Sequence, residues 1–256
     1  MANVIKLRKG LDVNLKGKAA KEEFQVKKPA VYALMPDDFT GMKPKVVVKE
    51  NDVVKVGDAL FVDKNHPEIK FVSPVSGRVT MVERGDRRKV LSVRVEADAE
   101  LQYVDFGKKS AGQMTAQEVK ALLLESGLFA FFKQRPYDVT ADPTDTPKAI
   151  FVSAFNSMPL AADFEYVLRG READFQAGLD ALAKMAKTYL GVSSKQTATA
   201  LTAAKNVEIN FFDGPAPAGN VGVQINHISP INKGEVVWTL GAEEVIFIGH
   251  LLNTGR

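Results

Sequence analysis

The stretch Phe71–Glu96, FVSPVSGRVTMVERGDRRKVLSVRVE, decides the fold of the first part of the chain. Its residues form two runs that alternate with a period of two, and Gly85-Asp86 separates the runs. The runs contain Val75, Val79 and Met81, then Val90, Ser92 and Arg94. Such alternation is typical of half-buried strands, and Gly-Asp is a turn signal. Upstream, Val46–Val62 repeats the plan with Gly57-Asp58 as its turn, so the two units together predict a compact β sandwich.

The segments Lys49–Leu60 and Ser73–Val79 resemble the lipoyl/biotinyl carrier fold, a barrel-sandwich hybrid. In carriers, a lysine on the hairpin between the two halves holds the cofactor, and Lys64 lies in about that place. However, the segment leading to Ser73 is about two residues longer than the carrier pattern, and Pro67 would stiffen the tip that presents the lysine. A solvated loop lysine is the favoured interpretation, and a carrier-type enzyme component is kept as an alternative.

Composition limits the functions that the chain can perform. The chain has 256 residues and a net charge of +3 with mixed signs, which gives no case for a nucleic-acid partner. The absence of cysteine excludes disulfides, thiolate nucleophiles and iron–sulfur ligation by this sequence. The three histidines are scattered and lack zinc-ligand spacing. No apolar run reaches membrane-spanning length, so we expect a soluble protein that reaches a membrane only through partners.

The pattern changes near residue 100, which predicts a second domain. Thr115 followed by Glu118 is a capping box that begins a helix, and Gly127 ends it. Buried strands and helices then alternate, which indicates βαβ units over a mostly parallel sheet. The expected strands are 148–154, 207–212, 219–225 and 236–240, and the expected helices are 163–169, 174–189, 196–204 and 241–252. No GxGxxG motif follows any strand, so the Rossmann dinucleotide fingerprint is absent.

The most unusual local composition is Leu128–Phe132, LFAFF, followed by two cations in Lys133–Arg135. Leu128, Phe131, Phe132 and Arg135 could form an apolar slot with a cation at its mouth, which would suit a quinone ring. The alternative is that the phenylalanines pack the helix against the sheet. Adjacent carboxylates at Glu243-Glu244 favour a helix-capping role over catalysis, because neighbouring side chains on a helix point apart.

Six segments along nearly the whole chain resemble the A-subunit family of the sodium-translocating NADH:quinone reductase, which is related to the flavin-binding subunit of complex I and to the C-subunit of the Rnf complex. They are IKLRKGLDV (5–13), SPVSGRV (73–79), SGLFAFFKQRPYD (126–138), VSAFNSMPLAAD (152–163), VLRGREADFQAGL (167–179) and VVWTLGAEEVIFIGHLLNTG (236–255). Flavin-binding relatives carry a GxGGAGFP loop and an acidic NxDEGEP strand end. Here the matching segments are Gly127–Phe132 and Ser153–Pro159, with bulky side chains in the first and no carboxylate in the second. The resemblance therefore implies that the ancestral flavin and NADH sites are filled or neutralised.

Taken together, these observations predict an α+β multidomain chain. A barrel-sandwich hybrid domain is expected over 1–100, a connector over 101–112 and an α/β Rossmann-like domain over 113–256, with the C-terminal domains of longer family members absent. The resemblance implies a subunit without its own cofactor, on the cytoplasmic face of the inner membrane, docked on partner subunits that carry NADH, flavins, iron–sulfur centres and ubiquinone. A flavin-dependent oxidoreductase is the other alternative.

The final helix, Gly241–Leu252, is apolar on almost every side. Because successive helical residues turn by about 100°, Ile246, Ile248, Leu251 and Leu252 cannot all face one sheet. We therefore expect part of this surface to remain exposed in the chain alone.

Overall fold

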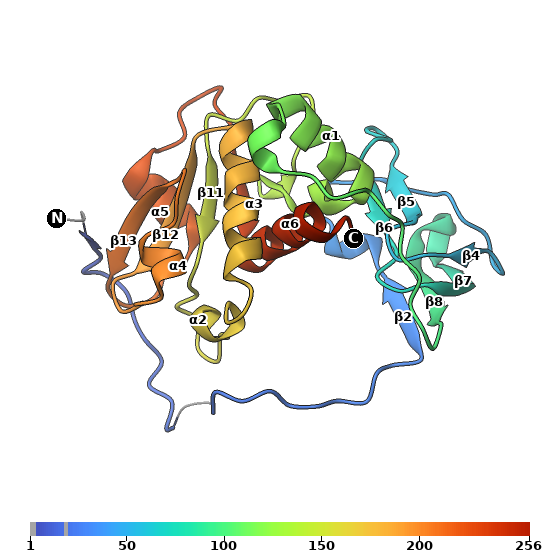
Figure 1. Cartoon of the computed structure of the whole chain (residues 1–256), viewed down its shortest axis with the longest axis horizontal. Helices are drawn as coiled ribbons and strands as arrows, with labels where there is room; N and C mark the ends of the chain where they lie inside the picture. Colours follow the sequence, from blue (N-terminus) through green and yellow to red (C-terminus); the bar gives the residue numbers. More distant parts are fainter. Residues whose placement is uncertain (1–3, 18–19) are drawn as a thin grey trace.

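The computed structural model describes residues 4–17 and 20–256, and it contains two lobes that lie side by side, a smaller β lobe and a larger α/β lobe (Figure 1). The smaller lobe is the barrel-sandwich hybrid, built from a four-stranded antiparallel sheet, β2-β8-β7-β4, and a three-stranded sheet, β3-β5-β6. Its strands are β2 (Val31–Leu34), β3 (Pro44–Val46), β4 (Val53–Val54), β5 (Ala59–Asp63), β6 (Lys70–Val72), β7 (Gly77–Arg84) and β8 (Val90–Ala97). The 3₁₀ turns η1 (Pro36–Asp38) and η2 (Asp86–Arg88) belong to the same lobe.

The predicted strand pair within Phe71–Glu96 is confirmed as the hairpin β7–β8. Val79 lies opposite Val95, and both are buried. The three-stranded sheet covers this hairpin with Phe61 and Phe71, whose stacked rings lie 5.0 Å apart between centroids. The alternating apolar residues of the two sheets thus meet in one core, as expected for a sandwich.

The larger lobe is an α/β domain with a seven-stranded sheet in the order β1-β13-β12-β11-β14-β9-β10. The first five strands in this order are parallel, β9 pairs antiparallel with β14, and β10 pairs antiparallel with β9. Its strands are β1 (Val4–Lys6), β9 (Lys133–Arg135), β10 (Val139–Thr140), β11 (Ile150–Ser153), β12 (Thr188–Ser193), β13 (Glu208–Asp213) and β14 (Val237–Gly241). Its helices are α1 (Ala116–Ser126), α2 (Phe164–Val167), α3 (Glu172–Met185), α4 (Thr199–Thr202), α5 (Val221–Ile228) and α6 (Ala242–Thr254), with 3₁₀ turns η3 (Ala111–Gln113) and η4 (Leu128–Phe131).

Helices cover both faces of this sheet, which explains why its strands read as continuous apolar runs. Phe151 and Tyr189 pack under α5 in a small cluster, whereas Ile150 and Val152 belong to the main core on the face of α3 and α6. The predicted mostly parallel Rossmann-like architecture is therefore confirmed. The capping box of Thr115 and the left-handed end at Gly127 are also present.

Two element predictions in this domain were wrong. The expected helix 174–189 ends at Met185, and Thr188–Ser193 is the buried strand β12, because its β-branched and aromatic residues favour a buried strand. The expected strand at 219–225 is helix α5, since the Asn220 side chain accepts hydrogen bonds from the backbone N–H groups of Gly222 and Val223 and thereby caps a helix.

The first strand lies outside the lobe to which the sequence assigned it. β1 pairs in parallel with β13, so Val4–Lys6 belongs to the α/β sheet and not to the barrel-sandwich lobe. Residues 7–17 and 20–30, between β1 and β2, lie along the edge of the molecule, as the blue trace in Figure 1 shows. Gly10 has a φ of 156° and approaches the carbonyl of Ala216, which only a glycine can do at this place.

Helix α6 also departs from the expectation of exposure. Ile246, Ile248, Leu251 and Leu252 are all at most 3% exposed. The helix lies between α3 and the barrel-sandwich lobe, so it is covered from two sides within this chain (Figure 1). Only Phe247 among its large apolar residues is exposed, at 45%.

Candidate functional site

A crevice lies at the switch point of the sheet, where the strands that follow β11 in the chain lie first on one side of it and then on the other. From β11 the chain proceeds outward through β12 and β13, and then returns to place β14 on the other side of β11. Ligands of open α/β sheets bind beyond the carboxyl ends of the two strands at this switch point. Here the residues after β11 and β14 line a cavity of about 730 Å³, which we call the switch-point crevice. Asp38 and Phe39 of the smaller lobe complete its wall.

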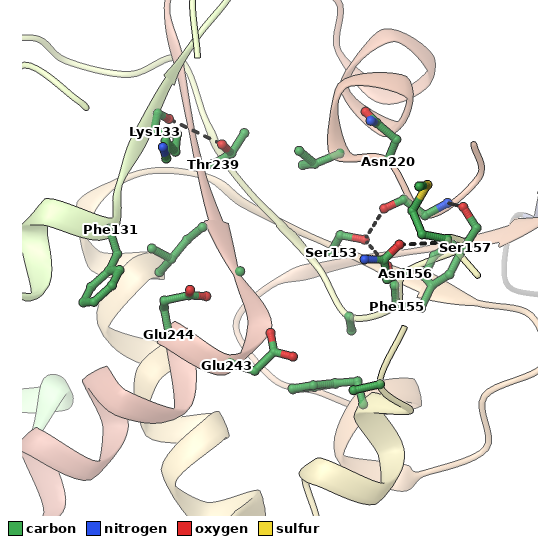
Figure 2. A pocket seen from close by; sticks show the side chains of 18 of the residues that line it. Phe131, Lys133, Ser153, Phe155, Asn156, Ser157, Asn220, Thr239, Glu243 and Glu244 are labelled. Carbon is green, nitrogen blue, oxygen red and sulfur yellow. Dashed lines mark hydrogen bonds between the residues drawn. The ribbon is translucent and has the colours of Figure 1, made fainter. Parts of the chain in front are cut away.

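The loop after β11 is held by hydrogen bonds that leave few of its polar groups free (Figure 2). Ser153 Oγ donates to the carbonyl of Phe155 at 3.0 Å, lies 3.3 Å from the carbonyl of Gly219, and accepts from Gln224 Nε2 at 2.9 Å. Asn156 Oδ1 accepts from Met158 N, and Ser157 Oγ accepts from Gly219 N. These groups fix the shape of the crevice and offer little to a ligand.

The carboxylates of the crevice come from the start of α6. Glu243 is exposed, while Glu244 is partly buried and its Oε2 atom has no hydrogen-bond partner among the described residues. Burial raises the pKa of the Glu244 carboxyl, and the neighbouring Glu243 adds to the shift. Lys133 is half-buried on the facing strand β9 and has no ion pair within the described part of the chain. Sequence reasoning gave Glu243 and Glu244 only a capping role, because their position at a switch point depends on the strand order.

A second cavity of about 850 Å³ lies between the two lobes, and we call it the interdomain cavity. Its lining is mostly apolar and comes from both lobes and from the segment that joins them. Residues that represent these three sources are Val72, Val104, Leu128, Phe131 and Phe247. A large apolar cavity with a few polar groups at its edge is typical of a site for an organic ligand.

The polar edge of the interdomain cavity is organised around Asp174 of α3. His250 Nδ1 lies 3.0 Å from Asp174 Oδ2, and Asn253 Nδ2 donates to Asp174 Oδ1 at 2.6 Å. Arg171 and Arg256 also line the cavity. The carboxylate fixes the orientation of the imidazole ring and leaves Nε2 available at the cavity edge, so His250 can exchange a hydrogen bond with a ligand oxygen.

The four residues proposed for quinone binding do not share one slot. Leu128 lines the interdomain cavity, and Phe131 lines both cavities and is 38% exposed. Phe132 is fully buried, stacks on Phe129 at 5.2 Å and meets Trp238 edge to face at 5.8 Å. Arg135 lines neither cavity of the described chain, and its Nε lies 3.4 Å from Asp138 Oδ1. The role of these residues in quinone binding stays a prediction.

The phenylalanine-rich turn also differs from the expectation that it fills a nucleotide site. Phe129 and Phe132 point into the core, and only Ala130 and Phe131 of the turn border the switch-point crevice. The crevice is therefore open. Segments 127–132 and 153–159, whose sequences depart from the flavin-binding pattern, form two of its borders but do not fill it.

The carrier-like hairpin β5–β6 ends in a turn that contacts the larger lobe. Lys64 is exposed, but His66 Nε2 lies 3.6 Å from Asp142 Oδ2 of the α/β domain. The buried Asp63 carboxylate accepts from the backbone N–H groups of Lys43 and Asn65 and tightens the same turn. A swinging carrier hairpin needs a free tip, so this contact argues against the carrier alternative.

Residues 4–17 and 20–256 contain no cluster of three or more histidine, aspartate or glutamate side chains placed to hold a metal ion. Over the same residues, none of the helices has both the length and the apolar character needed to span a membrane.

Comparisons with known proteins match both lobes to one family. Residues 5–98 match the model of the NqrA N-terminal barrel-sandwich hybrid domain, and residues 114–256 match that of the NqrA second alpha/beta domain. The matched ranges lie on either side of the segment that joins the lobes.

Curated relatives agree with this match. The A-subunit of the Na(+)-translocating NADH-quinone reductase of Pseudomonas aeruginosa (strain UCBPP-PA14) is 35% identical over 99% of this chain and 57% of the relative. The A-subunits of Yersinia pestis and of Neisseria meningitidis serogroup B are 36% and 33% identical, with the same coverage. The chain thus spans a little over half the length of these relatives. Because the two matched domains cover nearly all of it, the chain belongs to the NqrA family.

Proposed function

We propose that this chain is part of the A-subunit of a redox-driven sodium pump that oxidises NADH and reduces ubiquinone. The observation that carries the proposal is the match of both domains, in order, to the NqrA family. In this role the chain contributes no iron–sulfur ligand, because its sequence has no cysteine. The NADH, flavin and iron–sulfur chemistry then belongs to partner subunits, and the chain docks on them at the cytoplasmic face of the inner membrane.

The contribution proposed for this chain is to bind the quinone ring in the interdomain cavity. Leu128 and Phe131, two of the residues proposed from the sequence, line that cavity. Its apolar walls suit a ring and its isoprenoid chain, while His250 at the edge suits a ring oxygen. Phe132 and Arg135 line neither described cavity. They follow Phe131 closely in the chain, so their contribution is to hold the turn that carries Phe131.

Binding of a short-chain ubiquinone to the purified chain, followed by isothermal titration calorimetry, tests this contribution. Phe131→Ala removes a ring from the cavity, and we expect it to weaken binding about tenfold or more. Tyr137→Ala is the matched control, because Tyr137 is an aromatic residue of the same segment that is 81% exposed and lines neither described cavity. Equal affinity of the two variants would contradict a role for Phe131 in quinone binding.

The wider proposal has its own test. A tagged full-length protein should co-purify from membranes with a sodium-stimulated NADH:quinone reductase activity. The absorbance spectrum and the mass of the purified chain separate the alternatives, since a flavin band indicates an oxidoreductase and an added lipoyl or biotinyl mass on Lys64 indicates a carrier.

A further inference from the structure

The segment between β1 and β2 has no role in the proposed function. It comprises residues 7–17 and 20–30, which we call the strap, and it runs along the lower edge of the molecule in Figure 1 from the α/β lobe to the barrel-sandwich lobe. We propose that the strap binds directly to a membrane surface that contains anionic lipids. The proposal is independent of quinone binding, because the strap lines neither described cavity.

The strap is attached to the molecule at several points along its length. Asp12 Oδ1 accepts a hydrogen bond from Ala216 N of the α/β lobe. Lys21 forms an ion pair with Asp163, the residue that caps α2. The carbonyl of Ala30, the last residue of the strap, accepts a backbone hydrogen bond from β8 of the smaller lobe. These contacts use backbone groups and polar side chains, so they hold the strap in place without burying its apolar side chains.

The large apolar side chains of the strap are consequently open to solvent. Single exposed apolar residues are ordinary, but a group of them on one segment marks an interaction surface. The loop that ends at Asp163 contacts the strap through the ion pair with Lys21 and adds two more exposed apolar residues, Met158 and Leu160. Those of the strap itself are between 50% and 87% exposed and are Leu11, Val13, Leu15, Phe24 and Val26.

The strap also carries the excess positive charge of the chain. Residues 7–30 contain seven basic and three acidic residues, which gives a net charge of +4, whereas the net charge of the whole chain is +3. Six of the seven basic residues are lysines. Basic segments are attracted to anionic headgroups, and long lysine side chains reach lipid phosphates while neighbouring apolar side chains enter the acyl boundary.

The same composition argues against a protein as the partner of the strap. Lysine is depleted in the buried centre of protein interfaces, and lysine on an open chain edge opposes pairing with another sheet. Lys27 and Lys28 follow Phe24 and Val26 almost directly, so a protein that covered the apolar pair would also have to accommodate two adjacent cations. A lipid surface provides phosphates for the cations and hydrocarbon for the apolar side chains at the same time.

Co-sedimentation of the 256-residue chain with lipid vesicles tests the proposal. The vesicles contain either phosphatidylcholine alone or phosphatidylcholine mixed with phosphatidylglycerol, which is anionic. We expect binding to the mixed vesicles to be at least about tenfold stronger than binding to the neutral ones, and to weaken by a similar factor in high salt. Equal binding to both kinds of vesicle, or binding to neither, overturns the proposal.

Phe24→Ala tests whether the apolar side chains of the strap enter the lipid. It should weaken binding to the mixed vesicles about tenfold. Tyr137→Ala is the matched control, because Tyr137 is an aromatic residue of similar exposure outside the strap, and it should change binding less than about twofold. Equal binding by the two variants overturns the assignment to the strap. A chain that ignores the vesicles but forms a dimer in sedimentation velocity, which Phe24→Ala dissociates, would indicate a protein surface instead.

A pair of double variants tests the contribution of charge. Lys27→Gln/Lys28→Gln should weaken binding to the mixed vesicles about tenfold or more. Lys64→Gln/Lys233→Gln removes the same charge from exposed positions outside the strap and should change binding less than about threefold. Circular dichroism spectra identical to wild type establish that the variants fold. Equal losses in the two double variants would indicate a general effect of net charge and overturn the assignment to the strap.

Discussion

The crossing of α3 and α6 depends on two glycines, and replacing one of them is a quantitative test of the fold. A Cβ atom on Gly249 of α6 would lie 1.6 Å from the backbone carbonyl oxygen of Asp174 on α3. The helices would have to separate by roughly 1.5 Å or more to restore an ordinary contact. Overpacking of this kind costs about 3 kcal/mol, and the better helix propensity of alanine returns about 1 kcal/mol. Gly249→Ala should therefore lose about 2 kcal/mol of unfolding free energy.

Thermal unfolding followed by near-ultraviolet circular dichroism measures this loss. For a chain of this size, a loss of about 2 kcal/mol corresponds to a fall in Tm of about 4–8 °C. Gly112→Ala is the control, because its Cβ would meet only Ser110 Oγ at 3.7 Å, and it should stay within about 0.5 kcal/mol of wild type.

The partner glycine at the same crossing gives a further check. A Cβ on Gly178 would lie 2.0 Å from the carbonyl oxygen of Val245. Because one separation of the helices relieves both clashes, the double variant should lose less than the sum of the two single losses. A Tm of Gly249→Ala within about 1 °C of wild type would refute the tight crossing.

Three further predictions follow from the burial of particular side chains. Phe132→Ala should cost about 3–4 kcal/mol in denaturant titration, because the ring is fully buried against Phe129 and Trp238, whereas Phe131→Ala should cost less than about 1 kcal/mol. Burial raises the pKa of the Glu244 carboxyl above its ordinary value of 4.5. The folded protein therefore favours the protonated carboxyl. The contribution of this group to the free energy of unfolding is fully present below pH 4.5 and is lost as the pH rises through the higher pKa of the folded state. Glu244→Gln should therefore be more stable than wild type by about 1 kcal/mol at pH 7, and this gain should shrink toward pH 4; a gain that grows on acidification would contradict the assignment. Trypsin should cut the fully exposed segment 20–30 before the connector at 101–112, since Lys109 N donates to the carbonyl of Leu252; earlier cleavage in the connector, detected by mass spectrometry, would show that this contact is weak.

The sequence was informative wherever a signal is local. The alternation around Gly85 predicted the β7–β8 hairpin, and the Thr115 capping box predicted the start of α1. The apolar run Lys148–Ala154 predicted a buried parallel strand, and Ile150–Ser153 forms β11 in the middle of the sheet. These features depend on residues that are close together in the chain, so their physical cause can be read from composition and spacing.

The errors arose where distant segments meet. Nothing near Val4 indicates that its hydrogen-bond partner is the strand at Phe211, and nothing in the last helix indicates that a second lobe covers it. The same reason applies to the candidate sites. Leu128 and Phe131 were identified from an unusual local composition, but Glu244 and His250 were not, because their importance depends on the strand order and on the approach of the two lobes.

The pairing of β1 with β13 has a consequence for how the protein assembles during synthesis. Val4 leaves the ribosome about 200 residues before its partner Phe211. The barrel-sandwich lobe can fold in the meantime, so the N-terminal strand must remain unpaired until the α/β sheet forms and then close a long loop at an entropic cost. Strand β1 is consequently expected to pair with β13 late in folding, after both lobes have formed. An α/β domain produced without residues 4–12 would leave β13 as an open sheet edge, where a second chain can pair and begin aggregation.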